Sequence, residues 1–199
     1  MNKQLQRLAA VMICAIPGLA LAGTAPVNLL PNGDFGAANQ LAGWQYFGPG
    51  AMTWNADDAD ASANSGSMEL DTDAAGDPMD LTSSCFAVTP GAAYSYGLQG
   101  KVITGSFPAQ GFICSAYSMP NCATSTGALT PYPSSSSAAS WTAWNPASGI
   151  LPANAQSVDC SLHLANVIAV SAASVRFDNV FFNSIAPTTP VSLQSFEVD

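Results

Sequence analysis

The stretch SVRFDNVFF, residues 174–182, decides the fold of this chain. Val175 and Phe177 alternate with polar residues, as expected for a β-strand with one buried face. The next apolar pair, Val180 and Phe182, falls one step out of that phase. A β-bulge at Asp178–Asn179 would return both pairs to the core, and it predicts a special position for the aspartate carboxylate.

Other runs repeat the same period of two. In the run AAYSYGLQGKVI, one face collects Tyr94, Tyr96, Leu98 and Val102. In the run CSLHLANV, Leu162 and Leu164 point one way and His163 the other. Such alternation is typical of antiparallel strands with one face on the core. The remaining predicted strands are residues 67–71, 84–88 and 111–117.

Turn signals separate these strands, and helix signals are nearly absent. Ser, Thr, Ala, Gly and Pro dominate, whereas Glu, Lys and Arg, which populate exposed helix faces, are rare. The turns TPG (89–91) and NPASG (145–149) fall at intervals typical of a sandwich. The Ser/Pro-rich stretch 126–140 predicts a mobile loop, and the class is all-β.

The order of these pieces resembles the carbohydrate-binding modules of families four and nine. The pieces are NLLPNGDF from Asn28, GW at Gly43–Trp44, SGSMELD from Ser65, CFAVTPGAAYSYGLQGKV from Cys85, SWTAW from Ser140 and VRFDNVFF from Val175. The resemblance covers residues 27–183 and implies a two-sheet antiparallel jelly-roll β-sandwich of the galactose-binding-like superfamily. It places the N-terminal segment on a first strand, where Asn32–Gly33 shapes a turn or bulge.

The two ends of the chain predict its processing. Lys3 and Arg7 precede an apolar run, 8–21, that ends in the small-residue pattern ALA. Residues 1–22 therefore read as a cleaved signal peptide, so we expect a secreted or periplasmic protein without a membrane span. Residues 23–185 form the single domain, and 186–199 a tail that is either an edge strand or disordered.

The net charge of the chain limits the kinds of partner that it is expected to bind. The net charge is −9, and beyond the leader only Lys101 and Arg176 oppose 13 acidic residues. Nucleic acids and anionic membranes both require clustered Lys and Arg, so neither is expected as a partner. Neutral ligands such as an oligo- or polysaccharide fit this composition, and we expect a monomer.

Four cysteines lie beyond the leader: Cys85, Cys114, Cys122 and Cys160. In an exported chain they predict two disulfides, for which three connectivities are open. We favour Cys114–Cys122 together with Cys85–Cys160, although the sequence does not decide between the three. Zinc binding is not expected, because no CxxC spacing occurs and His163 stands apart.

The resemblance also implies one structural calcium ion. Related modules carry a glutamate directly after the Phe of the NGDF motif, where it helps hold the ion beside the Asp of FDNV. Here that position is Gly36, while Asp178 matches and Asp34 lies close in sequence. Calcium takes six to eight oxygens, many from backbone carbonyls, so Asp34 and Asp178 are the predicted metal ligands.

Aromatic rings are the predicted sugar platform, because a flat apolar face stacks on the C–H side of a pyranose. Trp44, Trp141, Tyr94 and Tyr96 are expected in the core. Trp144 has the opposite strand parity to Trp141 and is preferred as a ligand residue. The predicted ligand-binding residues are Tyr46, Trp54, Gln99, Tyr117 and Trp144.

Catalysis finds little support in the sequence. There is one histidine between leucines, no GxSxG motif, and the carboxylates fall mostly in turn-like segments. We therefore expect a non-catalytic carbohydrate-binding protein. The alternatives are a structural or interaction protein that keeps the fold without a sugar site, and a divergent hydrolase.

Overall fold

The computed structural model describes residues 26–72, 79–105, 109–133, 138–165 and 173–185. The proposed signal peptide and the tail 186–199 lie outside these residues. The strands are β1 (Val27–Asn28), β2 (Trp44–Phe47), β3 (Ala51–Asn55), β4 (Ser67–Thr72), β5 (Met79–Ser83), β6 (Phe86–Ala87), β7 (Ala93–Thr104), β8 (Ala109–Tyr117), β9 (Ser125–Ala128), β10 (Thr142–Ala143), β11 (Ala147–Ile150), β12 (Ser157–Ala165) and β13 (Ala173–Ile185). No helix long and apolar enough to cross a membrane occurs in this part of the chain.

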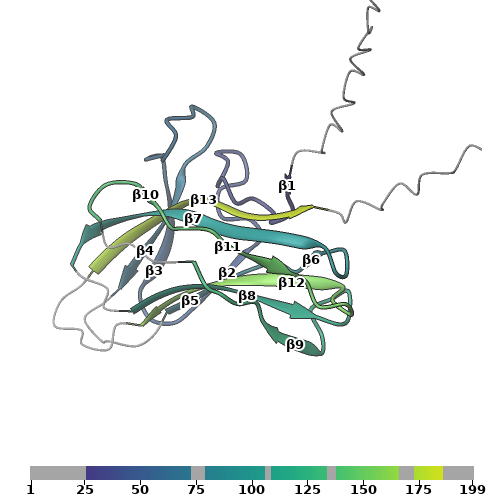
Figure 1. The fold of residues 1–199 in the computed structure, drawn as a ribbon. Coiled ribbons are helices and arrows are strands. Elements are labelled where there is room, and N and C mark those ends of the chain that lie inside the picture. Colours follow the sequence, from purple (N-terminus) through teal and green to yellow (C-terminus); the bar gives the residue numbers. More distant parts are fainter. Residues whose placement is uncertain (1–25, 73–78, 106–108, 134–137, 166–172, 186–199) are drawn as a thin grey trace, which may run out of the picture.

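Two antiparallel sheets stack face to face (Figure 1). Sheet A has the strand order β10-β7-β13-β4-β3, with β1 added on β13 and β11 on β7. Sheet B has the order β2-β5-β12-β8-β9, with β6 added on β12. The predicted all-β, two-sheet sandwich is confirmed. The sequence patterns missed β2, β3, β5, β10 and β11. Strand β11 covers most of the turn predicted at 145–149, and β9 begins just before the expected loop 126–140 and runs into it.

The bulge in β13 is confirmed. Asp178 pairs with Gln99 of β7, but the next paired residue, Phe181, lies opposite Gly97, so β13 carries one extra residue. Asn179 takes up this residue with a left-handed φ of 48°. As a result the apolar pairs on both sides of the bulge, Val175 and Phe177, Val180 and Phe182, all face the core with at most 1% exposure.

The core lies between the sheets and is rich in aromatic rings. Phe182 stacks on Tyr94 of β7 with ring centroids 5.6 Å apart, and Tyr96 meets Phe112 of β8 edge-on at 5.5 Å. On β12, Leu162 is fully buried, whereas the intervening His163 is only half-buried. The predicted inward faces of β7 and β12 are therefore confirmed.

The disulfide pairing differs from the one we favoured. Cys114 pairs with Cys160, and Cys85 with Cys122. The register explains the first bond, because Cys160 of β12 lies directly opposite Cys114 of β8, with their Cα atoms 4.0 Å apart. Cys114–Cys122 would have had to join an inward-facing strand residue to a left-handed turn residue, Cys122, beyond the end of β8.

The NGDF segment closes the sandwich at the bulge. The Val180 amide donates to the Gly33 carbonyl oxygen at 2.8 Å, and the Asn28 side chain bonds the backbone of Val180 and Phe182. A Cβ atom at Gly33 would lie 1.9 Å from the Val180 oxygen. Glycine is required here because the two backbones touch.

Gly33→Ala should lower the free energy of unfolding by about 3 kcal/mol, the upper range for overpacking a tight contact. Gly36→Ala is the matched control, since its added methyl would lie 3.8 Å from the nearest heavy atom outside the adjoining residues, the Asn64 backbone oxygen. Urea denaturation of both variants measures the difference. Equal stability of the two variants would contradict the close approach.

The two disulfides should differ in reactivity. Cys114 and Cys160 are 0% exposed, whereas Cys85 is exposed. Because thiol–disulfide exchange requires access to a sulfur, limited reduction of the folded protein should open Cys85–Cys122 first. Alkylation followed by peptide mass spectrometry identifies the released thiols; early labelling of Cys114 would contradict the prediction.

Candidate functional site

The solvent side of sheet B forms the candidate site, hereafter the sheet B face. Its residues alternate with the buried residues of the same strands. Its members are Gln45 and Phe47 of β2, Asp80 and Thr82 of β5, Asp159, Ser161 and His163 of β12, and Gly111, Ile113, Ser115 and Tyr117 of β8. Pairing between neighbouring strands lines these side chains up in rows across the sheet.

Two rows cross four strands each. One row is Gln45, Thr82, Ser161 and Ile113, and the other is Phe47, Asp80, His163 and Gly111. With strands about 4.8 Å apart, each row spans about 14 Å. An extended ligand laid across the strands would therefore meet side chains from all four.

Polar groups on this face are paired with one another. The hydroxyl oxygens of Thr82 and Ser161 lie 3.0 Å apart, and Nδ1 of His163 contacts Oδ1 of Asp80. The Tyr117 hydroxyl donates to both carboxylate oxygens of Asp159 at 3.1 and 3.2 Å. These bonds hold the side chains in place before any ligand binds.

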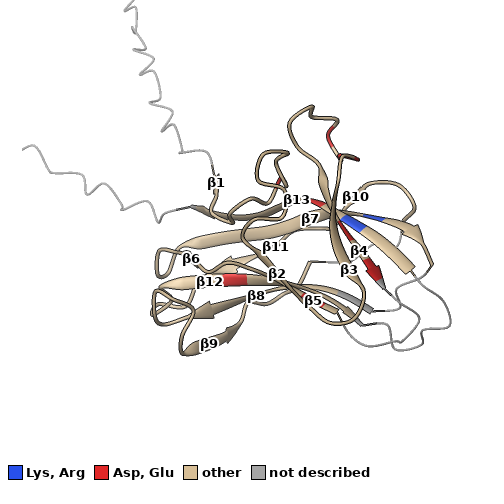
Figure 2. Cartoon of the chain, turned by 180° about the vertical axis from the view of Figure 1, so that it is seen from behind, with Lys and Arg blue, Asp and Glu red and all other residues tan. Residues whose placement is uncertain are grey.

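Burial shapes the electrostatics of the Tyr117–Asp159 pair. Desolvation raises the pKa of Asp159, although the hydrogen bond from Tyr117 opposes it. Desolvation also raises the pKa of Tyr117, and the neighbouring Asp159 charge adds to the effect. Tyr117 thus keeps its proton as a donor. The Lys and Arg residues of the described chain, Lys101 and Arg176, lie on sheet A, so the sheet B face carries no Lys or Arg side chain (Figure 2).

An exposed ring and a glycine complete the sheet B face. Phe47 is 55% exposed at one end of its row. At the other end Gly111 has no side chain, and a Cβ atom there would make only ordinary contacts, 3.8 Å to Ile113 and 4.0 Å to His163. The face therefore offers an apolar ring at one end of a polar row and a position without a side chain at the other.

The structure separates the predicted ligand residues. Tyr117 lies on the sheet B face, and Gln99 lies on the outer side of sheet A. Tyr46 and Trp54 are half-buried and pack against the core; the Tyr46 hydroxyl donates to the Pro49 oxygen. The Trp54 indole donates to the Phe35 oxygen at 2.8 Å. The five predicted ligand residues do not form one site.

Trp144 is a correction. It is 1% exposed and meets Phe177 edge-on at 5.9 Å, so its ring belongs to the core and offers no face to a sugar. Trp141, which we had expected in the core, is half-buried on sheet A beside Lys101. Strand parity correctly placed the two tryptophans on opposite sides of the chain, but it did not show which of these sides faces the core.

Several residues of the sheet B face were missed as ligand candidates. The alternation in β12 already placed Asp159, Ser161 and His163 on one side, away from the buried leucines. Phe47 lies in the same GWQYF run as Tyr46, one position further along. Which of the two rings was exposed depended on how β2 pairs with β5, and the sequence did not contain that register.

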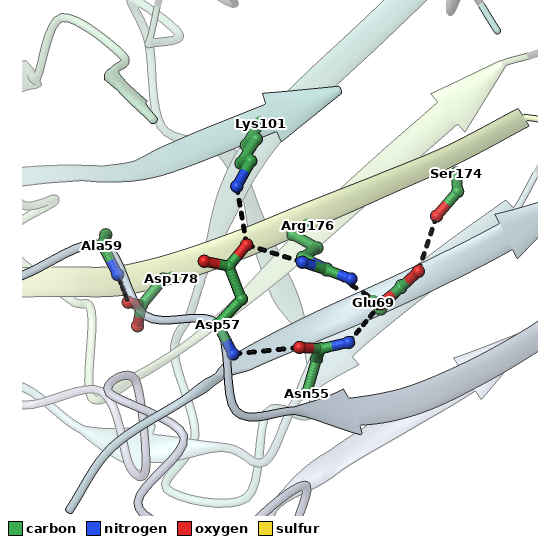
Figure 3. A network of polar contacts seen from close by, with 8 residues as sticks. All are labelled: Asn55, Asp57, Ala59, Glu69, Lys101, Ser174, Arg176 and Asp178. Atoms are coloured by element: carbon green, nitrogen blue, oxygen red, sulfur yellow. Dashed lines mark hydrogen bonds and ion pairs between the residues drawn. The ribbon is translucent and has the colours of Figure 1, made fainter. Parts of the chain in front are cut away.

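The two predicted metal ligands lie in different surroundings. Asp34 is exposed, whereas Asp178 is fully buried. The Asp178 carboxylate accepts an amide hydrogen from Ala59 at 2.8 Å (Figure 3). It accepts a second one from Asn179 at 2.6 Å. Among the described residues, no three Asp, Glu, His or Cys side chains are grouped to hold a metal. Calcium binding at Asp34 and Asp178 stays a prediction.

Comparisons with known proteins rest on structure alone. No family model matches the sequence, and no curated protein matches it. The enzymatically active domain of tailspike protein 4 from bacteriophage CBA120 superposes with a TM-score of 0.63 at 12% identity, over 79% of this chain and 21% of that one. An arabinose-bound GH51 α-L-arabinofuranosidase gives 0.54 at 15% identity, over 79% and 26%.

A third structure matches over nearly its whole length. The CBM22-2 xylan-binding domain from Paenibacillus barcinonensis gives a TM-score of 0.51 at 10% identity, over 76% of this chain and 97% of that domain. The chain shares the fold of carbohydrate-binding modules. It spans about a quarter or less of the two enzymes above, and at these identities the carbohydrate-binding-module fold is all that the likeness establishes.

Asp178 should make stability depend on pH. Burial raises its pKa to about 6, although the two amide bonds oppose this and the charges of Asp58 and Asp60 add to it. The folded state then holds a proton that the unfolded state releases near pH 4. The free energy of unfolding should fall by up to about 3 kcal/mol as the pH rises from about 4 to 6.5.

Thermal denaturation in EDTA between these pH values measures the effect. Asp178→Asn should flatten the slope, even though it lowers stability at every pH by replacing an acceptor oxygen with an amide group. An unchanged slope in this variant would contradict the assignment. Addition of calcium to the wild-type protein at pH 7.5 tests the predicted metal, because a bound ion would raise the melting temperature.

Proposed function

We propose that this protein is an extracytoplasmic, non-catalytic carbohydrate-binding module that holds a neutral oligo- or polysaccharide across the sheet B face. The observation that carries the proposal is the row formed by Phe47, Asp80, His163 and Gly111. This row joins the exposed Phe47 ring, hydrogen-bonding groups already held in place by each other, and a glycine that adds no side chain. The carbohydrate-binding-module fold supports the same conclusion.

The chemistry of the sheet B face suits sugar hydroxyls. Paired Thr82 and Ser161 hydroxyls and the Asp80–His163 pair offer both donors and acceptors, which a hydroxyl group needs on its two sides. Phe47 can cover the C–H side of a pyranose. The acidic groups Asp80 and Asp159 disfavour an anionic glycan, since each would oppose it with like charge.

A non-catalytic role fits the positions of the carboxylates. Asp159 lies four residues from His163 along β12, a separation of about 13 Å along the strand. Asp80 contacts that same His163 from β5. Glycosidases place their two carboxyl groups about 5 to 10 Å apart around one bond, so these two are too widely spaced.

The extracytoplasmic location rests on two features. Two disulfides join the four cysteines beyond the proposed leader, and such bonds persist in oxidising compartments. The leader-like pattern of residues 1–22 agrees with export.

The second candidate is a structural or interaction protein with the same fold. It is favoured by the inward packing of Tyr46, Trp54 and Trp144, which removes three rings that we had assigned to sugar. It is also favoured by the small Ser115, Ser161 and Thr82 side chains on the sheet B face. Glycan binding separates the two candidates.

Affinity electrophoresis on neutral polysaccharides, such as β-glucan, xylan and galactan, tests the proposal. Phe47→Ala should weaken the best interaction about tenfold, equivalent to about 1.4 kcal/mol, because the stacked ring is lost. The matched control is Ile150→Ala, which removes a 67%-exposed apolar side chain from sheet A and should leave binding unchanged.

A second variant adds a large side chain to the row at Gly111. Gly111→Leu should keep the fold, since a Cβ atom there makes only ordinary contacts, but it should abolish retardation by covering His163. Failure of the folded wild-type protein to be retarded by any polysaccharide would contradict the proposal and favour the interaction protein. Retardation that survives both substitutions would place the glycan elsewhere.

A further inference from the structure

The outer side of sheet A carries the cations of the described chain. Lys101 of β7 lies directly opposite Arg176 of β13, which lies opposite Glu69 of β4. Arg176 donates from Nε to Glu69 at 2.8 Å, and Glu69 is further held by Ser174 and Asn55 (Figure 3). Glu69 therefore neutralises one edge of the guanidinium.

A carboxylate from a loop sits between the two cations. Oδ2 of Asp57, just after β3, accepts from Lys101 Nζ at 2.7 Å and from Arg176 NH1 at 2.6 Å (Figure 3). The Lys101 ammonium also lies 5.6 Å from the centre of the Trp141 ring. Directly opposed like charges on neighbouring strands repel, so this pair of cations requires a shared anion.

The two cations belong to the sheet, whereas the anion does not. Lys101 and Arg176 are fixed on central strands, with side chains 23% and 17% exposed. Asp57 enters from the chain between β3 and β4, is 31% exposed, and is reached by water. Burial by itself would raise the pKa of Asp57, but the hydrogen bonds and charges of the two cations outweigh it and lower that pKa. The position thus favours an ionised carboxylate.

We propose that Lys101 and Arg176 form a second ligand site, on the sheet opposite the sheet B face, that takes the carboxylate of a uronic-acid residue in exchange for Asp57. The exchange replaces one carboxylate by another on the same two donors, so little desolvation is added. Gln99, two residues along β7 on the same side, can bond a ring hydroxyl, and the half-buried Trp141 borders the site. The sheet B face, with its acids, would not accept the same sugar.

Competition from Asp57 limits the affinity of this site. A tethered group has an effective concentration in the millimolar range or above, so a free uronate binds the wild-type protein weakly. Removal of the Asp57 charge ends the competition and leaves two cations without their shared anion. That change should favour any carboxylate that reaches them.

The test uses the whole protein, with oligogalacturonate as the probe. Titration calorimetry measures the affinity at low ionic strength and at about 0.15 M salt. Asp57→Asn should bind at least about tenfold more tightly than the wild-type protein, and salt should weaken binding in both. Lys101→Met, made in the Asp57→Asn background, should abolish the gain. Circular dichroism confirms that each variant is folded.

Two controls establish whether the gain in affinity depends on the paired cations and on the sugar ring. Asp60→Asn removes the same charge from the same loop without touching either cation, so it should not raise the affinity. Acetate should bind less well than oligogalacturonate, because it lacks the ring. The proposal is overturned if Asp57→Asn gains no affinity, if Asp60→Asn gains as much, if acetate binds equally well, or if Lys101→Met retains the gain.

Binding of oligogalacturonate at Lys101 and Arg176 should not depend on the sheet B face. Gly111→Leu should block neutral glycans and leave oligogalacturonate binding unchanged, since Gly111 lies in the other sheet. Loss of oligogalacturonate binding in that variant would place the acidic sugar on the sheet B face and overturn the second site. Loss of neutral-glycan binding alone would leave it standing.

Discussion

The bulge at Asp178–Asn179 is the constraint on which the rest of the structure depends. It lets one strand, β13, present four apolar side chains to the core across a change of phase. The backbone at the bulge also holds residues 28–33 in place. The Asn28 side chain bonds the Val180 oxygen, and Gly33 packs closely against Val180. Because β13 lies between β7 and β4, the bulge sets the register in which the second half of β13 pairs with β7. The buried carboxylate then ties the 57–65 segment to the sheet through the Ala59 amide.

Period-two patterns carried most of the fold. The inward faces of β7, β12 and β13 and the bulge itself followed from the positions of apolar residues, since a strand with one buried face has only one consistent phase. The disulfides could not be obtained in this way. Cys114 and Cys160 meet because β8 and β12 pair in a particular register, and pairing between distant strands is a property of the assembled sheet. Short edge strands such as β3 were missed because their burial pattern is irregular.

The candidate site was predictable in part. Alternation placed Asp159, Ser161 and His163 on the solvent side of β12, yet an aromatic residue alone does not show whether its ring is covered. Trp144 and Phe47 illustrate the two outcomes, one 1% and the other 55% exposed. Their difference comes from neighbours far apart in sequence: Phe177 against Trp144, and the paired β5 beside Phe47. Residue types alone therefore indicated the chemistry of the sheet B face, whereas its membership depended on strand pairing.

The two outer faces divide the charge of the protein. Sheet A holds the described lysine and arginine in ion pairs, and the sheet B face holds acids, hydroxyls and an exposed ring, so neutral and acidic sugars would be kept apart. Mapping of amide chemical shifts by NMR, during titration with the neutral oligosaccharide that binds best, tests this arrangement most directly. The largest changes should fall at Gln45, Thr82, Ser161 and His163. Changes concentrated in β7, β13 or the 57–65 segment, with these four amides unaffected, would contradict it.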